Sequence, residues 1–148
     1  MLVTAGPWRL EIESGSAARF LCGTFTGAAG NRPADNPYIP MSGNGAACDN
    51  TSGSFTIYQI AFDKRGKITR LNMTFNQTCD VSSGPMVGLV RYNATTPTPV
   101  PDLPSSVKPI TVPAHSGSTS ANADELSVQS APGDVIGGGR PADFTWGV

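Results

Sequence analysis

Few side chains in this sequence have both the type and the spacing that a reaction needs. The single histidine, His115, lies in a stretch rich in proline, serine and threonine. A catalytic histidine needs a rigid position and a partner that orients its ring, so we expect His115 to be a solvated residue. Cys22 would need a neighbouring base to act as a nucleophile, and the sequence shows none. We therefore expect Cys22 to be a buried structural thiol.

The 11 acidic residues are scattered along the chain. Glu11 and Glu13 share one face of a predicted strand, and the alternation of that strand assigns the face to solvent. A pair of catalytic carboxylates, as in a glycosidase, would require the fold to bring distant acids together. The sequence therefore predicts that the protein is not an enzyme and has no catalytic residues.

Few Asp and Asn side chains are spaced so that their oxygens could bind a cation together. Asp49, Asn50 and Asp134 lie in or beside predicted turns, but the Asp-x-Asp-x-Asp-Gly loop that holds Ca²⁺ is absent. Asp and Asn are also ordinary turn residues, so we predict no metal and no cofactor. The Gly43-Asn44-Gly45 stretch does not follow a strand and open a helix, as a phosphate-binding loop does.

A glycan is one partner that the sequence permits. Three residues of one predicted strand, Asn72, Thr74 and Asn76, share its outer face, and a face of Thr and Asn can bind sugars. Such a face is more often the solvated side of a sheet. Four Asn-x-Ser/Thr sequons could carry glycans in a host that glycosylates, at Asn50, Asn72, Asn76 and Asn93.

Charge and hydropathy argue against two classes of partner. The net charge is −1 and no basic stripe is present, so a nucleic-acid ligand lacks its electrostatic footprint. No apolar run approaches the ~20 residues of a membrane-spanning helix, so we predict no membrane insertion. The first residues have neither a basic segment nor a long apolar core, as a signal peptide does. Either the protein is not exported by that route, or the chain starts after the signal.

The composition is typical of an all-β protein. The 148 residues include 17 glycines and 13 prolines, and both residue types oppose helix interiors. The length suits one domain. Patterning predicts strands at residues 8–13, 19–28, 38–41 (short and at an edge), 54–62, 67–75 and 85–93. The expected core comprises Trp8, Leu10, Phe20, Phe25, Ile57, Tyr58, Ile60, Leu71, Met73, Phe75, Val87 and Leu89.

The clearest unit is a β-hairpin made by residues 54–62 and 67–75. Its turn, Asp63–Gly66, has Asp first and Gly at the position where a type I turn with a G1 bulge needs a positive φ. The apolar residues of the first strand change face midway, between Ile57 and Tyr58. This change predicts either a bulge or a strand covered on both sides.

Pairing across this hairpin would bring two of the three cysteines close together if it continues past the ends of the strands. If Phe62 faces Lys67, the numbers of opposed residues sum to about 129, and Cys48 and Cys79 nearly satisfy that sum. A disulfide requires Cα atoms within ~7 Å and would stabilise the fold by ~3–4 kcal/mol in the chain-entropy model. The alternative is two buried thiols in a reduced protein, and we favour the disulfide. No such argument applies to Cys22.

The composition changes after residue 93. Residues 94–123 contain six prolines, many Ser and Thr, and no apolar period, which predicts a linker with one short extended piece at Val107–Val112. Strand character returns at Leu126–Val128 and Phe144–Trp146, with glycine-containing turns between them. We therefore predict a β-sandwich module at 1–93, a Pro/Ser/Thr-rich linker at 94–123 and a C-terminal strand segment at 124–148.

Several short motifs follow one another along the first part of the chain. They are Trp8-Arg9-Leu10, Gly23-Thr24-Phe25-Thr26-Gly27-Ala28, Gly43-Asn44-Gly45-Ala46-Ala47-Cys48, Gly53-Ser54-Phe55-Thr56-Ile57, Phe75-Asn76-Gln77-Thr78-Cys79 and Arg91-Tyr92-Asn93. In this order they resemble an uncharacterised β-rich domain that occurs as tandem repeat modules in bacterial extracellular proteins. The resemblance covers roughly residues 6–93. It implies secretion and a Cys48–Cys79 disulfide, and it implies no activity.

The chain departs from that resemblance in two places. Such modules open with a strand that carries a Ser-x-Pro-Gly-Asp-x-Ile-Gly turn, which is missing before Trp8 and occurs instead at Ser130–Gly137. The chain therefore resembles the back of one module followed by the opening of another. Cys22 stands where no cysteine is expected, and we interpret it as a free buried thiol.

We therefore expect an antiparallel β-sandwich with a disulfide-closed hairpin, and with one strand to be supplied after the linker. Without that strand the sandwich has an open edge and exposed apolar surface. The expected strand-donor residues are Leu126, Val128, Pro132, Gly133, Val135 and Ile136. They could fill the gap in cis, could add to a neighbouring copy and build a head-to-tail filament, or could stay unpaired if the chain is a fragment.

These expectations favour a non-enzymatic extracellular structural or assembly module, secreted or on the cell surface, whose partners are copies of itself. The alternative is a carbohydrate- or surface-binding module of a secreted bacterial protein. A third hypothesis, less favoured by the residues, is a hydrolase with an unrecognised site.

Overall fold

The structure, a computed structural model, confirms an all-β antiparallel sandwich. It describes residues 1–15, 20–29, 36–48, 51–79, 84–97, 124–134, 136 and 142–146. Strands in these ranges form two sheets, and no helix occurs among them. None of the described residues therefore forms a helix long and apolar enough to cross a membrane.

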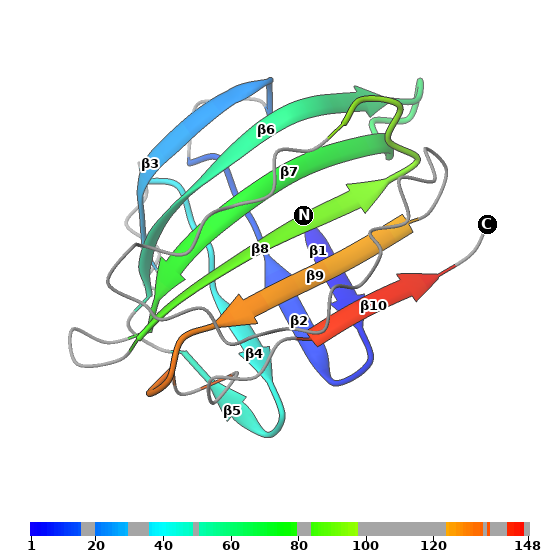
Figure 1. Ribbon diagram of the computed structural model, residues 1–148. Coiled ribbons are helices and arrows are strands. Elements are labelled where there is room, and N and C mark those ends of the chain that lie inside the picture. The colour runs from blue at the N-terminus through cyan, green and yellow to red at the C-terminus, as the bar shows by residue number, and fades with distance from the viewer. Residues whose placement is uncertain are drawn as a thin grey trace.

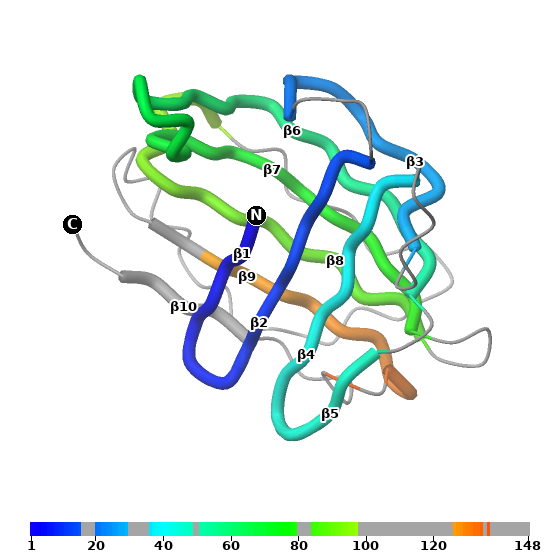
Figure 2. Tube along the Cα trace, turned by 180° about the vertical axis from the view of Figure 1, so that it is seen from behind, coloured from blue at the N-terminus to red at the C-terminus, as the bar shows by residue number. Residues whose placement is uncertain are grey.

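The two sheets face each other across the core. The smaller has the order β1-β2-β4-β5, with β1 (Leu2–Ala5), β2 (Trp8–Glu11), β4 (Met41–Gly43) and β5 (Ala46–Ala47). The larger has the order β10-β9-β8-β7-β6-β3, with β3 (Gly23–Ala29), β6 (Ser52–Phe62), β7 (Ile68–Thr78), β8 (Pro85–Tyr92), β9 (Asp124–Ser130) and β10 (Ala142–Trp146). The larger sheet lies in front in Figure 1 and behind in Figure 2, and its strands run across those of the smaller sheet.

Two strands of the smaller sheet differ from the prediction. Strand β1 was not expected, and it pairs with β2 from Leu2↔Glu11 to Ala5↔Trp8. The expected edge strand at 38–41 is present only as β4, which begins at Met41 and lies between β2 and β5. The nearby prolines precede β4, so they do not interrupt its ladder.

The β6–β7 hairpin has the turn that its sequence predicts. The Gly66 amide donates to the Asp63 carbonyl at 3.0 Å, and Gly66 has a φ of 78°. The Asp63 Oδ1 accepts hydrogen bonds from the amides of Arg65 and Lys67 at 2.8 and 2.9 Å. The side chain of Asp63 therefore stabilises the turn that joins the two longest strands.

The change of face in β6 is a bulge. The register shifts between Ile57 and Gln59, which makes Tyr58 the extra residue. Tyr58 is 39% exposed, and its hydroxyl is 3.3 Å from that of Thr74. The prediction that Tyr58 belongs to the core is therefore wrong, because the bulge turns its ring to the outer face.

Cys48 and Cys79 form the expected disulfide, with their Cα atoms 5.2 Å apart. Both residues are buried, and the buried hydroxyl of Thr51 donates to the Cys48 sulfur at 3.1 Å. The bridge closes the end of the hairpin opposite its turn. The prediction that Cys22 is buried is wrong: its thiol is free and exposed, because it directly precedes β3 at the edge of the larger sheet.

The core fills the space between the sheets. The larger sheet contributes chiefly Phe55, Ile57, Leu71, Met73, Phe75, Met86, Val90, Leu126 and Val128, and the smaller sheet and its flanks contribute Trp8, Leu10, Ile12, Ile39 and Met41. Phe20, Phe25 and Ile60 are partly buried against this cluster, as expected. Val87 is buried, as expected, although its register partner Asn76 places it on the outer face of the larger sheet. Leu89, opposite Thr74 on the same face, is only half-buried, so the prediction that Leu89 belongs to the core is wrong.

The outer face of the larger sheet is only partly solvated. Asn72 is fully buried, because its side-chain amide donates to the Thr96 and Pro97 carbonyls at 2.9 and 3.3 Å. Residues 94–97 thus lie over this end of the sheet, and Thr74 is only 9% exposed. The predicted polar face of Asn72, Thr74 and Asn76 is therefore open only at Asn76.

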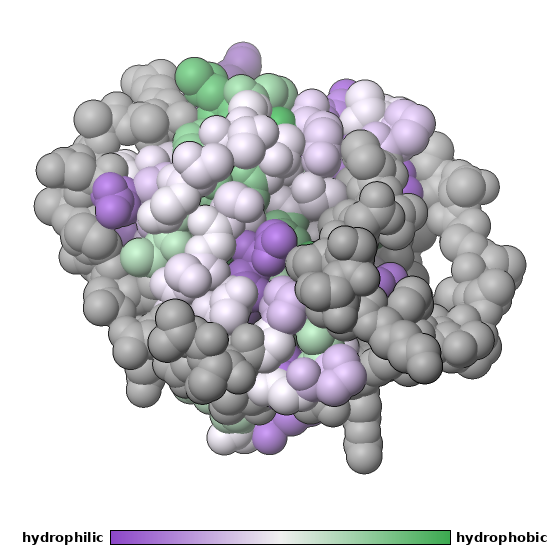
Figure 3. All heavy atoms as spheres, turned by 60° about the vertical axis from the view of Figure 1, so that its left-hand side comes forward, coloured by the Kyte–Doolittle hydropathy of each residue, from purple (hydrophilic) through white to green (hydrophobic). Residues whose placement is uncertain are grey.

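The exposed part of this face lies toward β3. Thr24 and Thr56 are register partners, and their hydroxyls are 3.0 Å apart. Figure 3, which brings the β3 side forward, shows mostly pale described residues here, as expected for Thr, Ser and Gly, with hydrophobic residues gathered toward one end.

Candidate functional site

The C-terminal segment completes the larger sheet in cis. Strand β9 pairs with β8 from Met86↔Ser130 to Arg91↔Glu125, and β10 then pairs with β9 on its other side. Leu126 and Val128 are both fully buried. Figure 1 shows β9 between β8 and β10, so a segment distant in sequence forms an internal strand of the sheet.

The packing of β8 against β9 depends on Gly88, whose missing side chain leaves room for the ring of Phe75. Gly88 lies between Phe75 on β7 and Val128 on β9. A Cβ atom at Gly88 would lie 2.6 Å from Phe75 Cε1 and 2.6 Å from the Ser127 carbonyl oxygen. The Phe75 ring therefore occupies the space that a side chain at position 88 would take.

The turn after β9 connects the segment to the smaller sheet. The Asp134 amide donates to the Ala131 carbonyl at 3.1 Å, and its buried carboxylate accepts from the Ser130 hydroxyl at 2.9 Å. The Ile136 carbonyl accepts a hydrogen bond from the Asn44 side chain, in the β4–β5 turn, at 3.4 Å. The segment therefore contacts both sheets.

The expected strand-donor residues have different environments. Leu126, Val128 and Ile136 are buried. Pro132 and Gly133 form the exposed turn, where Gly133 has a φ of 89°. Val135 lies outside the described residues. The apolar residues of this segment are therefore the ones that it buries in the core, and Pro132 and Gly133 form the turn that follows β9.

A second candidate site is a polar hollow on the outer face of the smaller sheet, here called the β2–β4 hollow. Its volume is about 240 Å³, and it is lined by Arg9, Glu11, Tyr38, Pro40, Met41, Ser42, Ala47 and Cys48. The neighbours Leu10, Ile12 and Ile39 are fully buried in the core, so alternation turns Arg9, Glu11 and Tyr38 outward.

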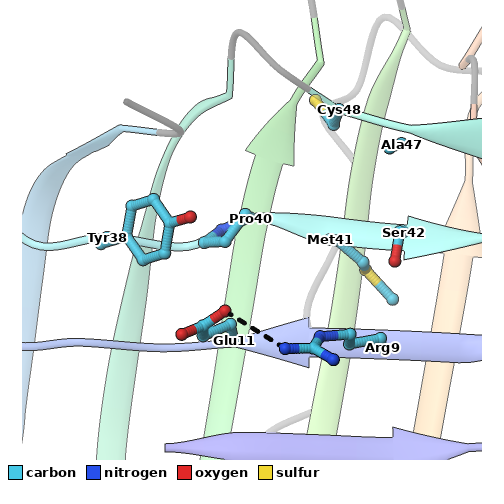
Figure 4. Close-up of a pocket in the computed structure, with 8 residues that line it drawn as sticks. All are labelled: Arg9, Glu11, Tyr38, Pro40, Met41, Ser42, Ala47 and Cys48. Atoms are coloured by element: carbon cyan, nitrogen blue, oxygen red, sulfur yellow. Dashed lines mark ion pairs between the residues drawn. The ribbon is translucent and has the colours of Figure 1, made fainter. Parts of the chain in front are cut away.

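Cross-strand pairing fixes the backbone positions of the residues that line the hollow. Arg9 pairs with Ser42, and the Glu11 amide donates to the Pro40 carbonyl at 3.0 Å. Tyr38 exchanges two backbone hydrogen bonds of 2.9 Å with Glu13. Figure 4 shows Tyr38, Pro40 and Ser42 in a row along one strand line, with Glu11 and Arg9 along the next.

The charged pair of the hollow is loose. The Arg9 Nη2 and Glu11 Oε2 atoms are 3.8 Å apart, and the side chains are 58% and 28% exposed. This separation is longer than the ~2.7–2.9 Å of a close charge-assisted hydrogen bond. Both groups therefore remain partly accessible to solvent.

The sequence pattern predicts only part of this hollow. Alternation places Glu11 and Glu13 on a solvent face, and Glu11 does line the hollow on the outer face of the smaller sheet. The same pattern does not connect Glu11 with Tyr38 and Ser42, although Tyr38, Pro40 and Ser42 alternate with the buried residues of their stretch. The missing information was which strand pairs with β2.

The other residues considered for chemistry form no site within the described part of the chain. His115 lies outside the described residues. Among those described, no three His, Cys, Asp or Glu side chains are grouped so as to hold a metal ion. Asp134 contacts Ser130 within the fold, and Asp49 and Asn50 lie outside the described ranges.

Comparisons with protein-family models, with curated proteins and with solved structures find no match for this chain. The resemblance to a bacterial extracellular repeat module therefore stays a prediction from the sequence motifs.

Proposed function

We propose that the protein is a non-enzymatic extracellular structural module that assembles by exchanging the β9–β10 hairpin between copies. One observation carries the proposal: core residues Leu126 and Val128 come from a strand that follows β8 only after the long connection 93–123. The disulfide supports an extracellular location, because such bridges persist in oxidising compartments.

Exchange would preserve the contacts of the closed fold. The same β8–β9 ladder forms whether β9 belongs to its own chain or to a neighbour, so the two states differ mainly in chain entropy. A random coil of roughly 30 residues, the length of the connection between β8 and β9, would have an average end-to-end distance of ~30 Å. A tethered β9 has an effective concentration up to the millimolar range. Dilute protein should therefore be monomeric, and exchange should require crowding on a surface or transient opening.

A test of exchange can use the exposed Cys22 as the single labelling position. Two samples labelled with donor and acceptor dyes are mixed at high concentration, partly unfolded, refolded and diluted. We expect energy transfer that persists in linear oligomers on size exclusion with light scattering. Absence of energy transfer after this treatment would refute exchange.

A locked variant and a matched control identify the exchanged element. Leu89 and Ser127 are register partners on the outer face, so oxidised Leu89→Cys/Ser127→Cys should hold β9 in cis and abolish energy transfer. The pair Thr56→Cys/Thr74→Cys links β6 to β7 in the same manner and should leave exchange intact. Equal exchange by both locked proteins would show that another element is exchanged.

A second candidate function, binding of a carbohydrate or of a surface, is favoured by the β2–β4 hollow. Its polar and aromatic lining, on a face that no described strand covers, is the specific observation. A screen of the monomeric protein against immobilised glycans tests this function without reference to exchange.

A further inference from the structure

We propose that the β2–β4 hollow binds one ring of a neutral saccharide, with its apolar face against Tyr38 and Pro40 and its hydroxyls on Arg9 and Glu11. This inference rests on the second candidate function and is independent of strand exchange.

The charged pair offers both a hydrogen-bond donor and a hydrogen-bond acceptor to the hydroxyls of a sugar. Each hydroxyl of a sugar both donates and accepts. The Arg9 guanidinium can only donate, and the Glu11 carboxylate can only accept. Because these groups are 3.8 Å apart and both are partly exposed, neighbouring hydroxyls can bond to both at once. Hydrogen bonds to charged groups are the stronger kind in proteins.

The backbone at the aromatic side of the hollow is fixed by pairing. Tyr38 is half-buried, and its backbone bridges both Glu13 and Ala29. A tyrosine presents a large apolar surface at low entropic cost, since its side chain has only two rotatable bonds. At the other end of the hollow the Cys48 amide donates to the Met41 carbonyl at 3.2 Å, and the disulfide fixes Cys48. The lining is therefore preorganised, which lowers the cost of binding.

Charge and backbone geometry disfavour other classes of ligand. Arg9 is the one basic residue among those that line the hollow, and it already lies 3.8 Å from Glu11, so an acidic polymer or a nucleic acid would meet no cluster of positive charge on these residues. An extended peptide usually adds to an open sheet edge. The hollow instead lies over β2 and β4, which are both internal strands of the smaller sheet. A neutral polyhydroxyl ligand fits these constraints.

The size of the hollow sets the expected affinity. About 240 Å³ is below the ~300–1,000 Å³ of pockets for drug-sized ligands, so it fits a single ring. A ligand of about a dozen non-hydrogen atoms is expected to bind with a Kd of order 1 mM. Several copies held side by side would bind a polysaccharide far more tightly through avidity.

The test uses the full monomeric chain, ¹⁵N-labelled, titrated with methyl glucoside, methyl galactoside, methyl mannoside and N-acetylglucosamine. We expect amide shifts at Arg9, Glu11 and Ser42 for at least one sugar. Arg9→Ala and Glu11→Gln should each weaken that binding at least roughly tenfold. Arg70→Ala, which removes an exposed arginine from the larger sheet, should change it less than about twofold.

The outcomes separate this inference from the function on which it rests. Sugar binding whose shifts map to another surface, or that both variants leave unchanged, would overturn the hollow as the site while leaving carbohydrate binding intact. Binding only to the sulfated polysaccharide heparin would overturn the neutral class. No binding to any of these probes, together with a blank glycan screen, would overturn both. Unchanged melting of the variants excludes loss by unfolding.

Discussion

Replacing Leu126 by alanine measures how much the C-terminal segment stabilises the module. Leu126 is fully buried opposite Val90, and buried Leu→Ala substitutions cost about 2–5 kcal/mol. The site lies between two strands with little room to collapse, so we expect about 3 kcal/mol. For a chain of this size that loss lowers the melting temperature by roughly 6–12 °C.

The assay is urea denaturation followed by tryptophan fluorescence and circular dichroism, with thermal melting as a second measurement. Leu21→Ala is the matched control, because Leu21 is 65% exposed and surface substitutions usually change stability by less than about 0.5 kcal/mol. The midpoint for Leu126→Ala should fall while the denaturant slope stays the same, since β9 unfolds together with the rest of the sandwich.

Two results would contradict this reasoning. A Leu126→Ala change within about 0.5 kcal/mol of zero would mean that β9 does not share the core of residues 1–97. A separate early transition, with the main transition unmoved, would mean that the C-terminal hairpin docks as an independent unit. In either case the proposal of strand exchange would lose its basis.

Three further predictions concern single features. Gly88→Ala should destabilise the fold by about 1–3 kcal/mol, because the added methyl group displaces the Phe75 ring; chemical denaturation measures this change, and a neutral effect would contradict the close packing. Joint replacement of Cys48 and Cys79 by alanine should cost about 3–4 kcal/mol by removing a loop closure, and calorimetry showing an unchanged melting temperature would refute it. In the native protein a maleimide should add once, at Cys22, the exposed free thiol; mass spectrometry that finds no adduct, or more than one, would disagree.

Local patterns were sufficient for the hairpin and for its covalent closure. The Asp63–Gly66 turn sets the register of β6 and β7, and extending that register brought Cys48 near Cys79. The change of face at Ile57 predicted a bulge as one of two options. In each case the partners are neighbours in sequence or follow from one turn, so short-range rules apply.

The predictions from sequence were wrong or incomplete where segments distant in the chain determine whether a side chain is buried. Asn72 alternates as an outer residue, but residues 94–97 return over it. Tyr58 faces outward because the bulge falls at its own position, which the pattern alone could not choose. The β2–β4 hollow needs the pairing of β2 with β4, and two strands of three or four residues carry too little pattern to specify their partner.

The position of β9 inside the larger sheet also affects how the chain is synthesised. When β8 has emerged from the ribosome, its free edge and the apolar residues Met86 and Val90 await a strand encoded about 40 residues later. At ordinary rates of translation that delay is roughly 2–8 s. Folding of the module should therefore be completed only after β9 has emerged, and an intermediate with an unpaired edge should persist until then. A truncated product that ends before Asp124 would retain this edge permanently, and we expect it to depend on chaperones or to aggregate.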